Sequence, residues 1–140
     1  MKNNAQIRIR GTQVVNGEKD CIELTTEGFF CEKDGSYFIS YREDELVGVK
    51  GMSTTIKIEG ESRAVVMKGG PTPSTLIIEP QKRNLCHYAT PYGNLLFGIS
   101  NAKIHAGFDE NGGSANIRYS LDVNTETFSD NVLDIKVKRS

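Results

Sequence analysis

The chain lacks tryptophan, lacks a charge excess of either sign, and lacks any apolar run long enough to cross a membrane. Its 140 residues include 17 lysines and arginines against 18 aspartates and glutamates, which gives a formal net charge of −1. Nucleic-acid-binding surfaces need clustered basic residues, whereas the basic residues here stand mostly singly among acids. We therefore expect no nucleic-acid partner. Without about 20 consecutive apolar residues we also expect no membrane span.

Cysteine is scarce, and its spacing suggests no pairing. The three cysteines are Cys21, Cys31 and Cys86, an odd number without a Cys-x-x-Cys pair. This argues against a disulfide framework and against the usual zinc-binding spacing. The first residues are polar and contain no apolar stretch of the kind found in signal peptides. We therefore expect a cytoplasmic protein with free thiols, because disulfides form in oxidising compartments.

Motifs for catalysis or cofactor binding are also missing. Gly69-Gly70 is followed by Pro71 rather than by the residues of a phosphate-binding loop, and no serine lies in a Gly-x-Ser-x-Gly elbow. The two histidines, His87 and His105, lack the spacing of a metal-binding pair. We expect no metal, no cofactor and no enzymatic activity. An enzyme would need a histidine, a cysteine and a carboxylate brought together in one pocket.

What the chain does contain is one short β-strand after another, separated by turn residues. Residues 52–59 show the pattern most clearly, because Met52, Thr54, Ile56 and Ile58 alternate with polar side chains. This is the period of a strand with one buried face. The expected strands cover residues 5–15, 20–32, 36–43, 52–59, 61–68, 75–79, 84–90, 94–108, 115–124 and 132–138. No segment shows a convincing helical period.

The number and spacing of these strands predict an all-β fold in a single domain spanning residues 1–140. Short connections make neighbours in sequence neighbours in the sheet. A twisted meander of this length tends to close on itself, because closure removes exposed edges. Glycines inside two long strands, Gly28 and Gly98, are expected to bend them. The prediction is a single antiparallel, mostly up-and-down β-barrel of about 8–10 strands.

Polar and aromatic residues inside the expected strands are candidates for a binding site. A small barrel is either packed solid or just wide enough for one small ligand. We expect tyrosines and threonines to line such an interior, with charged groups at its mouth. The candidate residues are Tyr41, Glu43, Thr54, Lys68, His87, Tyr88, Thr90, Tyr92 and Tyr119. The alternative is that the tyrosines are core residues whose hydroxyls reach the rim of the barrel.

Two segments are apolar on both faces of their expected strands: residues 29–30, Phe-Phe, and residues 95–97, Leu-Leu-Phe. A loop, a terminal segment or a second subunit has to cover their outer side. The alternative function is therefore a non-catalytic interaction or structural module that acts as a homodimer.

Five segments, in order along the chain, carry a resemblance to a known family. They are Tyr41-Arg42-Glu43, Thr54-Thr55-Ile56-Lys57-Ile58, Val66-Met67-Lys68-Gly69-Gly70, Tyr88-Ala89-Thr90-Pro91-Tyr92-Gly93 and Asn131-Val132-Leu133-Asp134-Ile135. In this order they resemble the small bacterial YwiB-like family of unknown function, with Lys68 where that family usually has arginine. The resemblance implies a calycin-like (lipocalin-like) barrel and an intracellular location, and it brings no catalytic residues.

Overall fold

The computed structural model describes residues 3–42, 52–70, 73–90 and 93–140, and every regular element in them is a β-strand. The strands are β1 (Ala5–Val15), β2 (Glu18–Lys33), β3 (Ser36–Arg42), β4 (Ser53–Glu59), β5 (Arg63–Gly69), β6 (Ser74–Ile78), β7 (Asn84–Thr90), β8 (Gly93–Asp109), β9 (Gly112–Val123) and β10 (Glu126–Arg139). Within the described ranges, no helix is long and apolar enough to cross a membrane. The all-β prediction is confirmed.

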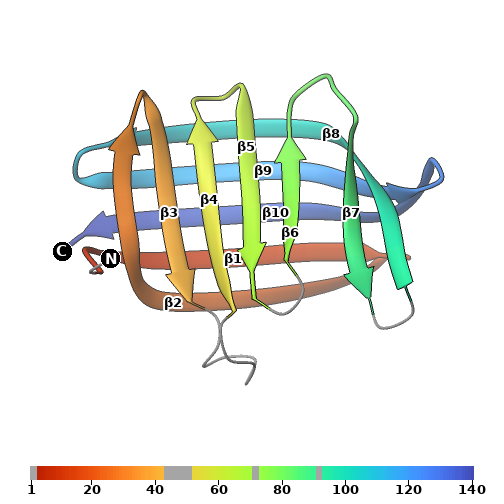
Figure 1. The fold of residues 1–140 in the computed structure, drawn as a ribbon, viewed down its shortest axis with the longest axis horizontal. Helices are drawn as coiled ribbons and strands as arrows, with labels where there is room; N and C mark the ends of the chain where they lie inside the picture. The colour runs from red at the N-terminus through yellow and green to blue at the C-terminus, as the bar shows by residue number, and fades with distance from the viewer. Residues whose placement is uncertain (1–2, 43–51, 71–72, 91–92) are drawn as a thin grey trace.

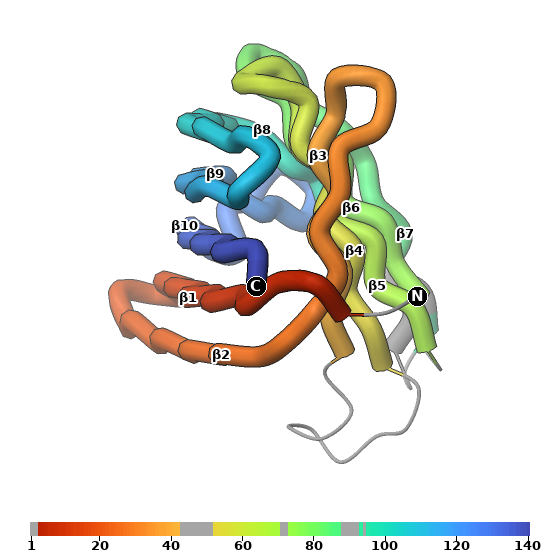
Figure 2. Tube along the Cα trace, turned by 90° about the vertical axis from the view of Figure 1, so that its left-hand side faces the viewer, coloured from red at the N-terminus to blue at the C-terminus, as the bar shows by residue number. Residues whose placement is uncertain are grey.

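The ten strands form one antiparallel sheet in the order β6-β5-β4-β3-β2-β1-β10-β9-β8-β7. Adjacent strands in this sheet are also consecutive in sequence, except that β1 pairs with β10 and so joins the two halves of the meander. The sheet curls into two layers whose strands cross. One layer holds β3 to β7, and the other holds β1, β9, β10 and most of β2 and β8 (Figures 1 and 2). The predicted antiparallel barrel is therefore present and is nearly closed.

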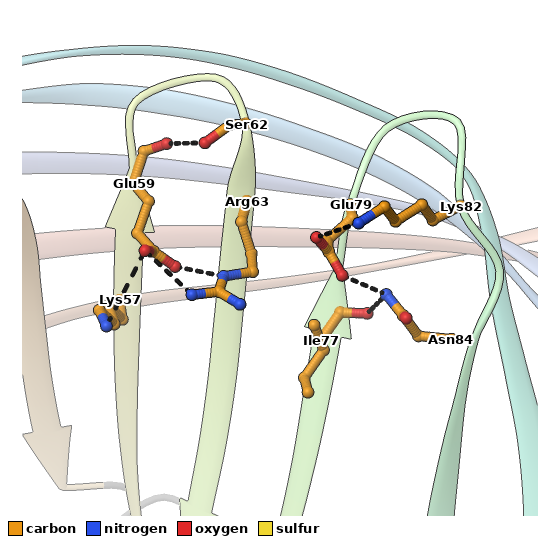
Figure 3. A network of polar contacts seen from close by, with 8 residues as sticks. All are labelled: Lys57, Glu59, Ser62, Arg63, Ile77, Glu79, Lys82 and Asn84. Carbon is orange, nitrogen blue, oxygen red and sulfur yellow. Dashed lines mark hydrogen bonds and ion pairs between the residues drawn. The ribbon is translucent and has the colours of Figure 1, made fainter.

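The remaining gap in the barrel wall lies between β6 and β7, the two ends of the sheet order. Side chains span this gap next to the β6–β7 turn (Figure 3). The Asn84 Nδ2 amide donates to the carbonyl oxygen of Ile77 at 3.0 Å and to Glu79 Oε1 at 3.2 Å. Lys82 Nζ lies 3.4 Å from the second oxygen of Glu79. Polar side chains therefore tie the two edge strands together at this end.

Two long strands carry the sheet from one layer to the other. β2 pairs with β1 as far as Gly28 and with β3 from Phe29 onward, so the predicted bend at Gly28 is confirmed. A Cβ at Gly28 would lie 2.3 Å from Ile7 Cδ1 and 2.4 Å from the carbonyl oxygen of Ser40. Glycine is needed there because the two layers approach each other too closely for any side chain.

The second crossing strand, β8, changes partner at the second predicted glycine. It pairs with β7 as far as Ile99 and with β9 from Gly98 onward, and its register shifts just afterward. The Arg83 guanidinium lies over Gly98, in the space that a Cβ would occupy. From there Arg83 binds Asp122 on β9 through two hydrogen bonds, of 2.5 Å and 3.1 Å. Gly98 thus leaves room for a bidentate ion pair on the outer wall.

One end of the barrel interior is filled by side chains. Phe30, Tyr37 and Phe108 form a cluster with ring centroids 5.4 to 5.9 Å apart. The side-chain amide of Asn4 pairs with the main chain of Phe30, accepting from its N–H at 2.8 Å and donating to its carbonyl at 2.9 Å. Around the cluster, the fully buried isoleucines are Ile7, Ile39, Ile56, Ile58, Ile78, Ile99, Ile117 and Ile135. We call this region the packed end.

Candidate functional site

The other end of the barrel interior is hollow. A cavity of about 770 Å³ lies between the two layers and opens to solvent, a volume within the roughly 300–1,000 Å³ usual for small-molecule sites. All ten strands contribute to its lining. We call this region the hollow end. Phe30, Tyr37 and Phe108 do not line it, and Ile56 is the one fully buried isoleucine of the described residues that does.

Four lining side chains form a transverse row across the layer of β3 to β6. Tyr41 lies opposite Thr54 in the strand register. Thr54 in turn lies opposite Lys68, and Lys68 lies opposite Ser74. Directly paired residues on antiparallel strands project to the same side of the sheet, and all four contribute to the cavity wall. We refer to these four residues as the lysine row.

A second polar row faces the cavity from the other layer. Tyr119 lies opposite Asn131, Asn131 lies opposite Gln13, and Gln13 lies opposite Asp20. All four line the cavity, and we call them the amide row. Asn131 is buried, and its Nδ2 donates to the hydroxyl of Ser129 at 3.0 Å. The cavity therefore has a polar row on each of its two walls.

The wall beside the lysine row is apolar. Each strand also carries an apolar residue two positions away from the lysine row. Ile56 pairs with Val66, and Val66 pairs with Leu76. All three line the cavity. Leu121 and Leu133 supply a matching apolar surface from the opposite layer. A ligand in this space would contact a polar row and an apolar surface at the same time.

Two hydroxyls of the lysine row are buried without hydrogen-bond partners. Thr54 is 1% exposed and Ser74 is 8% exposed. Among the described residues, neither Thr54 Oγ1 nor Ser74 Oγ has a partner. Buried hydroxyls are nearly always hydrogen-bonded in proteins, and each one left unpaired costs about 1–3 kcal/mol. Two such groups on one cavity wall are the strongest functional signal in the described part of the chain.

Two titratable groups at the cavity are held neutral. Burial raises the pKa of the Tyr119 hydroxyl above its ordinary value. Burial likewise raises the pKa of the Cys86 thiol, and the backbone N–H of Thr75 opposes this only in part. A neutral tyrosine can donate a hydrogen bond, whereas a thiol with a raised pKa is a poor nucleophile. The cavity is therefore better suited to binding than to nucleophilic chemistry.

The structure brings together four of the nine residues predicted to form the site. Tyr41, Thr54, Lys68 and Tyr119 line the cavity. His87 is exposed and is not part of the lining, because its neighbour Cys86 faces inward and successive residues of a strand face opposite sides. His87 therefore does not line this cavity, and its part in binding stays a prediction.

The other four predicted site residues cannot be placed in the cavity. Glu43 and Tyr92 lie outside the described residues. Tyr88 and Thr90 belong to β7, but their side chains are not among those described. Their part in binding stays a prediction.

Sequence reasoning missed several lining residues because strands begin earlier than expected. Ser74 opens β6, one residue before the predicted start at residue 75, so the predicted strand did not include its hydroxyl. Asn131 lies within β10, which begins at Glu126 rather than at residue 132. Gln13 lies inside a correctly predicted strand, but its place opposite Asn131 depends on the pairing of the first and last strands. No local pattern reveals that pairing.

Other side-chain clusters offer weaker sites. No group of three or more His, Cys, Asp or Glu residues in the described ranges can hold a metal ion. On the outer wall, Arg10 Nε donates to the exposed Cys21 Sγ at 3.2 Å, and this hydrogen bond lowers the pKa of the thiol. Glu23 lies beside the same arginine, at 3.6 Å. These groups lie in solvent, where ion pairs contribute little.

The fold and the cavity define the class of this protein: an antiparallel ten-stranded β-barrel, nearly closed, with one packed and one hollow end. The chain belongs to the DUF1934 family, described as a domain of unknown function, whose model matches residues 7–135. The predicted membership of the YwiB-like family is confirmed.

One relative and one solved structure agree with this assignment. The chain is 26% identical over 128 residues to the uncharacterized β-barrel protein YwiB of Bacillus subtilis (strain 168), covering 90% of this chain and 88% of that protein. It superposes on the crystal structure of the ywiB protein from Bacillus subtilis with a TM-score of 0.81 at 20% identity, covering 99% of this chain and 92% of the other. The structural likeness supports the barrel fold. Neither description names a ligand or an activity.

Proposed function

We propose that this protein binds a small ligand in the cavity at the hollow end. The observation that carries the proposal is the pair of buried, unpartnered hydroxyls of Thr54 and Ser74 on the wall of a 770 Å³ space. A ligand that hydrogen-bonds to them removes a penalty of about 1–3 kcal/mol for each group. The mixed polar and apolar lining is typical of small-molecule sites.

Two further expectations belong with this proposal. The first is that the barrel is calycin-like, since barrels of the lipocalin type hold one small ligand in the interior. The second is a cytoplasmic location. The three cysteines are free, and the most accessible of them, Cys21, is exposed, which fits a reducing compartment.

The proposal is tested with Nile red, a neutral apolar dye whose fluorescence shifts to the blue in an apolar site. Val66 and Val65 are neighbours on β5, but Val66 lines the cavity and is 5% exposed, whereas Val65 faces outward. We expect the wild type and Val65→Trp to bind the dye. Val66→Trp should weaken binding because the indole takes up space beside the apolar wall of the cavity.

Circular dichroism establishes that each variant is folded, and Leu76→Trp is a second way to fill the same space if Val66→Trp does not fold. Dye binding by folded Val66→Trp or Leu76→Trp at wild-type affinity would place the dye elsewhere and contradict the proposal. A wild type that binds no apolar dye would contradict it as well.

A second candidate function is self-association into a homodimer. Ile77, Leu85 and Leu96 are 37%, 59% and 44% exposed. All three lie on the outer face of β6, β7 and β8, because their inward neighbours Ile78 and Cys86 are buried. Large apolar side chains gathered on one face favour a protein partner. A net charge of −1 offers little repulsion between two copies.

Sedimentation at micromolar concentration tests the homodimer. The expected result is a dimer that becomes a monomer in Leu85→Glu, with Lys136→Glu, exposed on β10 in the other layer, as the control. A wild type that sediments as a clean monomer would exclude this candidate and leave the ligand-binding proposal untouched.

A further inference from the structure

The lysine row holds a cation between two unsatisfied hydroxyls. Lys68 is opposite Thr54 on one side and opposite Ser74 on the other. Side chains in directly paired positions lie about 4.5–5.5 Å apart at Cβ, so the three side chains project from one small region of the cavity wall. Within the described part of the chain, Lys68 makes no ion pair, and neither hydroxyl has a partner.

All three groups can donate to an acceptor. The lysine ammonium carries three N–H donors and no acceptor, and each hydroxyl carries one O–H donor beside its two acceptor lone pairs. A negatively charged oxygen acceptor would satisfy all of them, through hydrogen bonds that are shorter and stronger than those between neutral groups. A ligand cation would repel Lys68, and a neutral alcohol would leave its charge without a partner.

The charge count selects a monoanion. Lys68 and Asp20 are the charged residues of the described cavity lining, and Asp20 lies on the opposite wall and is exposed. One ammonium neutralises one negative charge. A dianionic phosphate would leave an uncompensated charge in a partly buried site, which is unfavourable.

The surroundings of the lysine row define the rest of the ligand. Ile56, Val66 and Leu76 continue the same wall with apolar surface. Leu121 and Leu133 face them from the other layer. A carboxylate alone would leave most of the 770 Å³ cavity unfilled, whereas an apolar chain or ring attached to it would bury its surface there.

We infer that the ligand is an amphipathic monocarboxylate whose acid group binds Lys68, Thr54 and Ser74 and whose apolar body lies against Ile56, Val66 and Leu76. This inference rests on the proposed function, since it assigns the chemical class of the ligand to the same cavity. It gives Lys68 the part of a specificity-determining residue.

Three probes with the same chain and different head groups test the inference: decanoate, decanol and decylamine. Each is titrated against bound Nile red, below the concentration at which it forms micelles. We expect decanoate to bind the wild type about tenfold more tightly than decanol, the gain usual for one charge-assisted contact. Decylamine should bind most weakly.

Variants of Lys68 separate charge from packing. Lys68→Met keeps the length of the side chain but removes its charge, so decanoate and decanol should bind with equal affinity. Lys68→Arg should retain the preference for decanoate because the positive charge remains. Lys57→Met is the matched control, since Lys57 faces outward on β4 over the ring of Phe38, and its preference should equal that of the wild type.

The outcomes distinguish this inference from the proposed function. Equal binding of decanoate and decanol to the wild type would overturn the inference, while the proposed function would stand. A preference for decylamine would also overturn it, and would point to Asp20 as the residue that binds the head group. Failure of all three probes to displace the dye would contradict the choice of an amphipathic ligand. Failure of the dye itself to bind would contradict the proposed function.

Discussion

The two ends of the barrel are built from the same strands but differ in what fills them. At the packed end, Phe30, Tyr37 and Phe108 occupy the space between the layers. At the hollow end, the corresponding rows carry threonine, serine, lysine, glutamine and asparagine, and a cavity remains. Side chains of the first kind contribute large apolar surfaces to the core. Side chains of the second kind leave space and hydrogen-bonding groups.

Stability and binding therefore depend on different residues along the same strands. On β4, for example, Ile58 is fully buried away from the cavity, whereas Thr54 lines it. The packed end can therefore hold the fold while the hollow end carries polar groups that weaken it. Natural binding sites commonly sacrifice stability in this way.

Replacing one phenylalanine at each end by alanine should give the largest difference in the free energy of unfolding. Phe30 is 1% exposed, and Phe30→Ala should lower the free energy of unfolding by about 3–5 kcal/mol. Phe97 lines the cavity and is only half-buried, so Phe97→Ala should lower it by no more than about 2 kcal/mol. Urea denaturation of both variants measures the difference. Equal losses would show that the two ends are packed alike.

Replacing two glycines by alanine should give a smaller difference in stability between a tightly packed position and a cavity position. Gly28→Ala places a methyl group against Ile7 and the Ser40 carbonyl, and overpacking of this kind should destabilise by about 1–3 kcal/mol. Gly11 lines the cavity, and a Cβ there meets nothing within 4 Å. Gly11→Ala should stabilise by about 0.4–1 kcal/mol, because alanine has less freedom in the unfolded chain. Thermal unfolding monitored by circular dichroism measures both, and a destabilised Gly11→Ala would contradict the existence of free space there.

Valine substitutions at two adjacent threonines on β4 test whether the Thr54 hydroxyl is unpaired. Thr54→Val removes a buried group without a partner and should stabilise the ligand-free protein by about 1 kcal/mol. Thr55 faces outward, where its hydroxyl lies 3.1 Å from that of Ser40, so Thr55→Val should destabilise by up to about 1 kcal/mol. Thr54→Val should also weaken the binding of decanoate. A destabilised Thr54→Val would mean that its hydroxyl is satisfied in solution, and would remove one support of the proposed function.

The contribution of the Arg83–Asp122 ion pair to stability should depend on pH. The hydrogen bonds from Arg83 hold the pKa of Asp122 below its ordinary value of 3.8. A carboxyl whose pKa is lower in the folded state stabilises fully above the unfolded value, and loses this contribution as the pH falls through the folded value. We expect wild-type stability to fall as the pH is lowered below about 4, with a shallower decline in Asp122→Asn. Denaturant titrations at a series of pH values measure this small effect, and identical slopes would contradict it.

Much of the fold was readable from local patterns, because strand alternation and turn residues act over a few positions. All four residues of the Asn16-Gly17 and Asp34-Gly35 turns have a left-handed backbone conformation, with φ between 52° and 80°. Two-residue hairpin turns require this conformation. The bend at Gly28 was also predicted. The bounds were less accurate where sequences are polar, as at the start of β10, whose register with β9 shifts between Thr127 and Ser129.

The candidate site was only partly readable. Tyr41, Thr54, Lys68 and Tyr119 were selected because polar or aromatic side chains stood within expected strands, and the structure places them on the cavity wall. Ser74 and Asn131 were missed because both precede the predicted start of their strand, by one residue of β6 and within the first six residues of β10. His87 lies in a strand whose bounds were predicted correctly, and only the burial of Cys86 shows which face of β7 is inward.

The all-β class, the order of strands and the hairpin turns follow from the amino-acid sequence, because they depend on residues close together in the chain. The pairing of β1 with β10, the row of Thr54, Lys68 and Ser74, and the hollow end of the barrel emerge only in the folded protein. These features depend on register between strands and on the volume left between two layers. Both are properties of residues far apart in sequence, which no local pattern records.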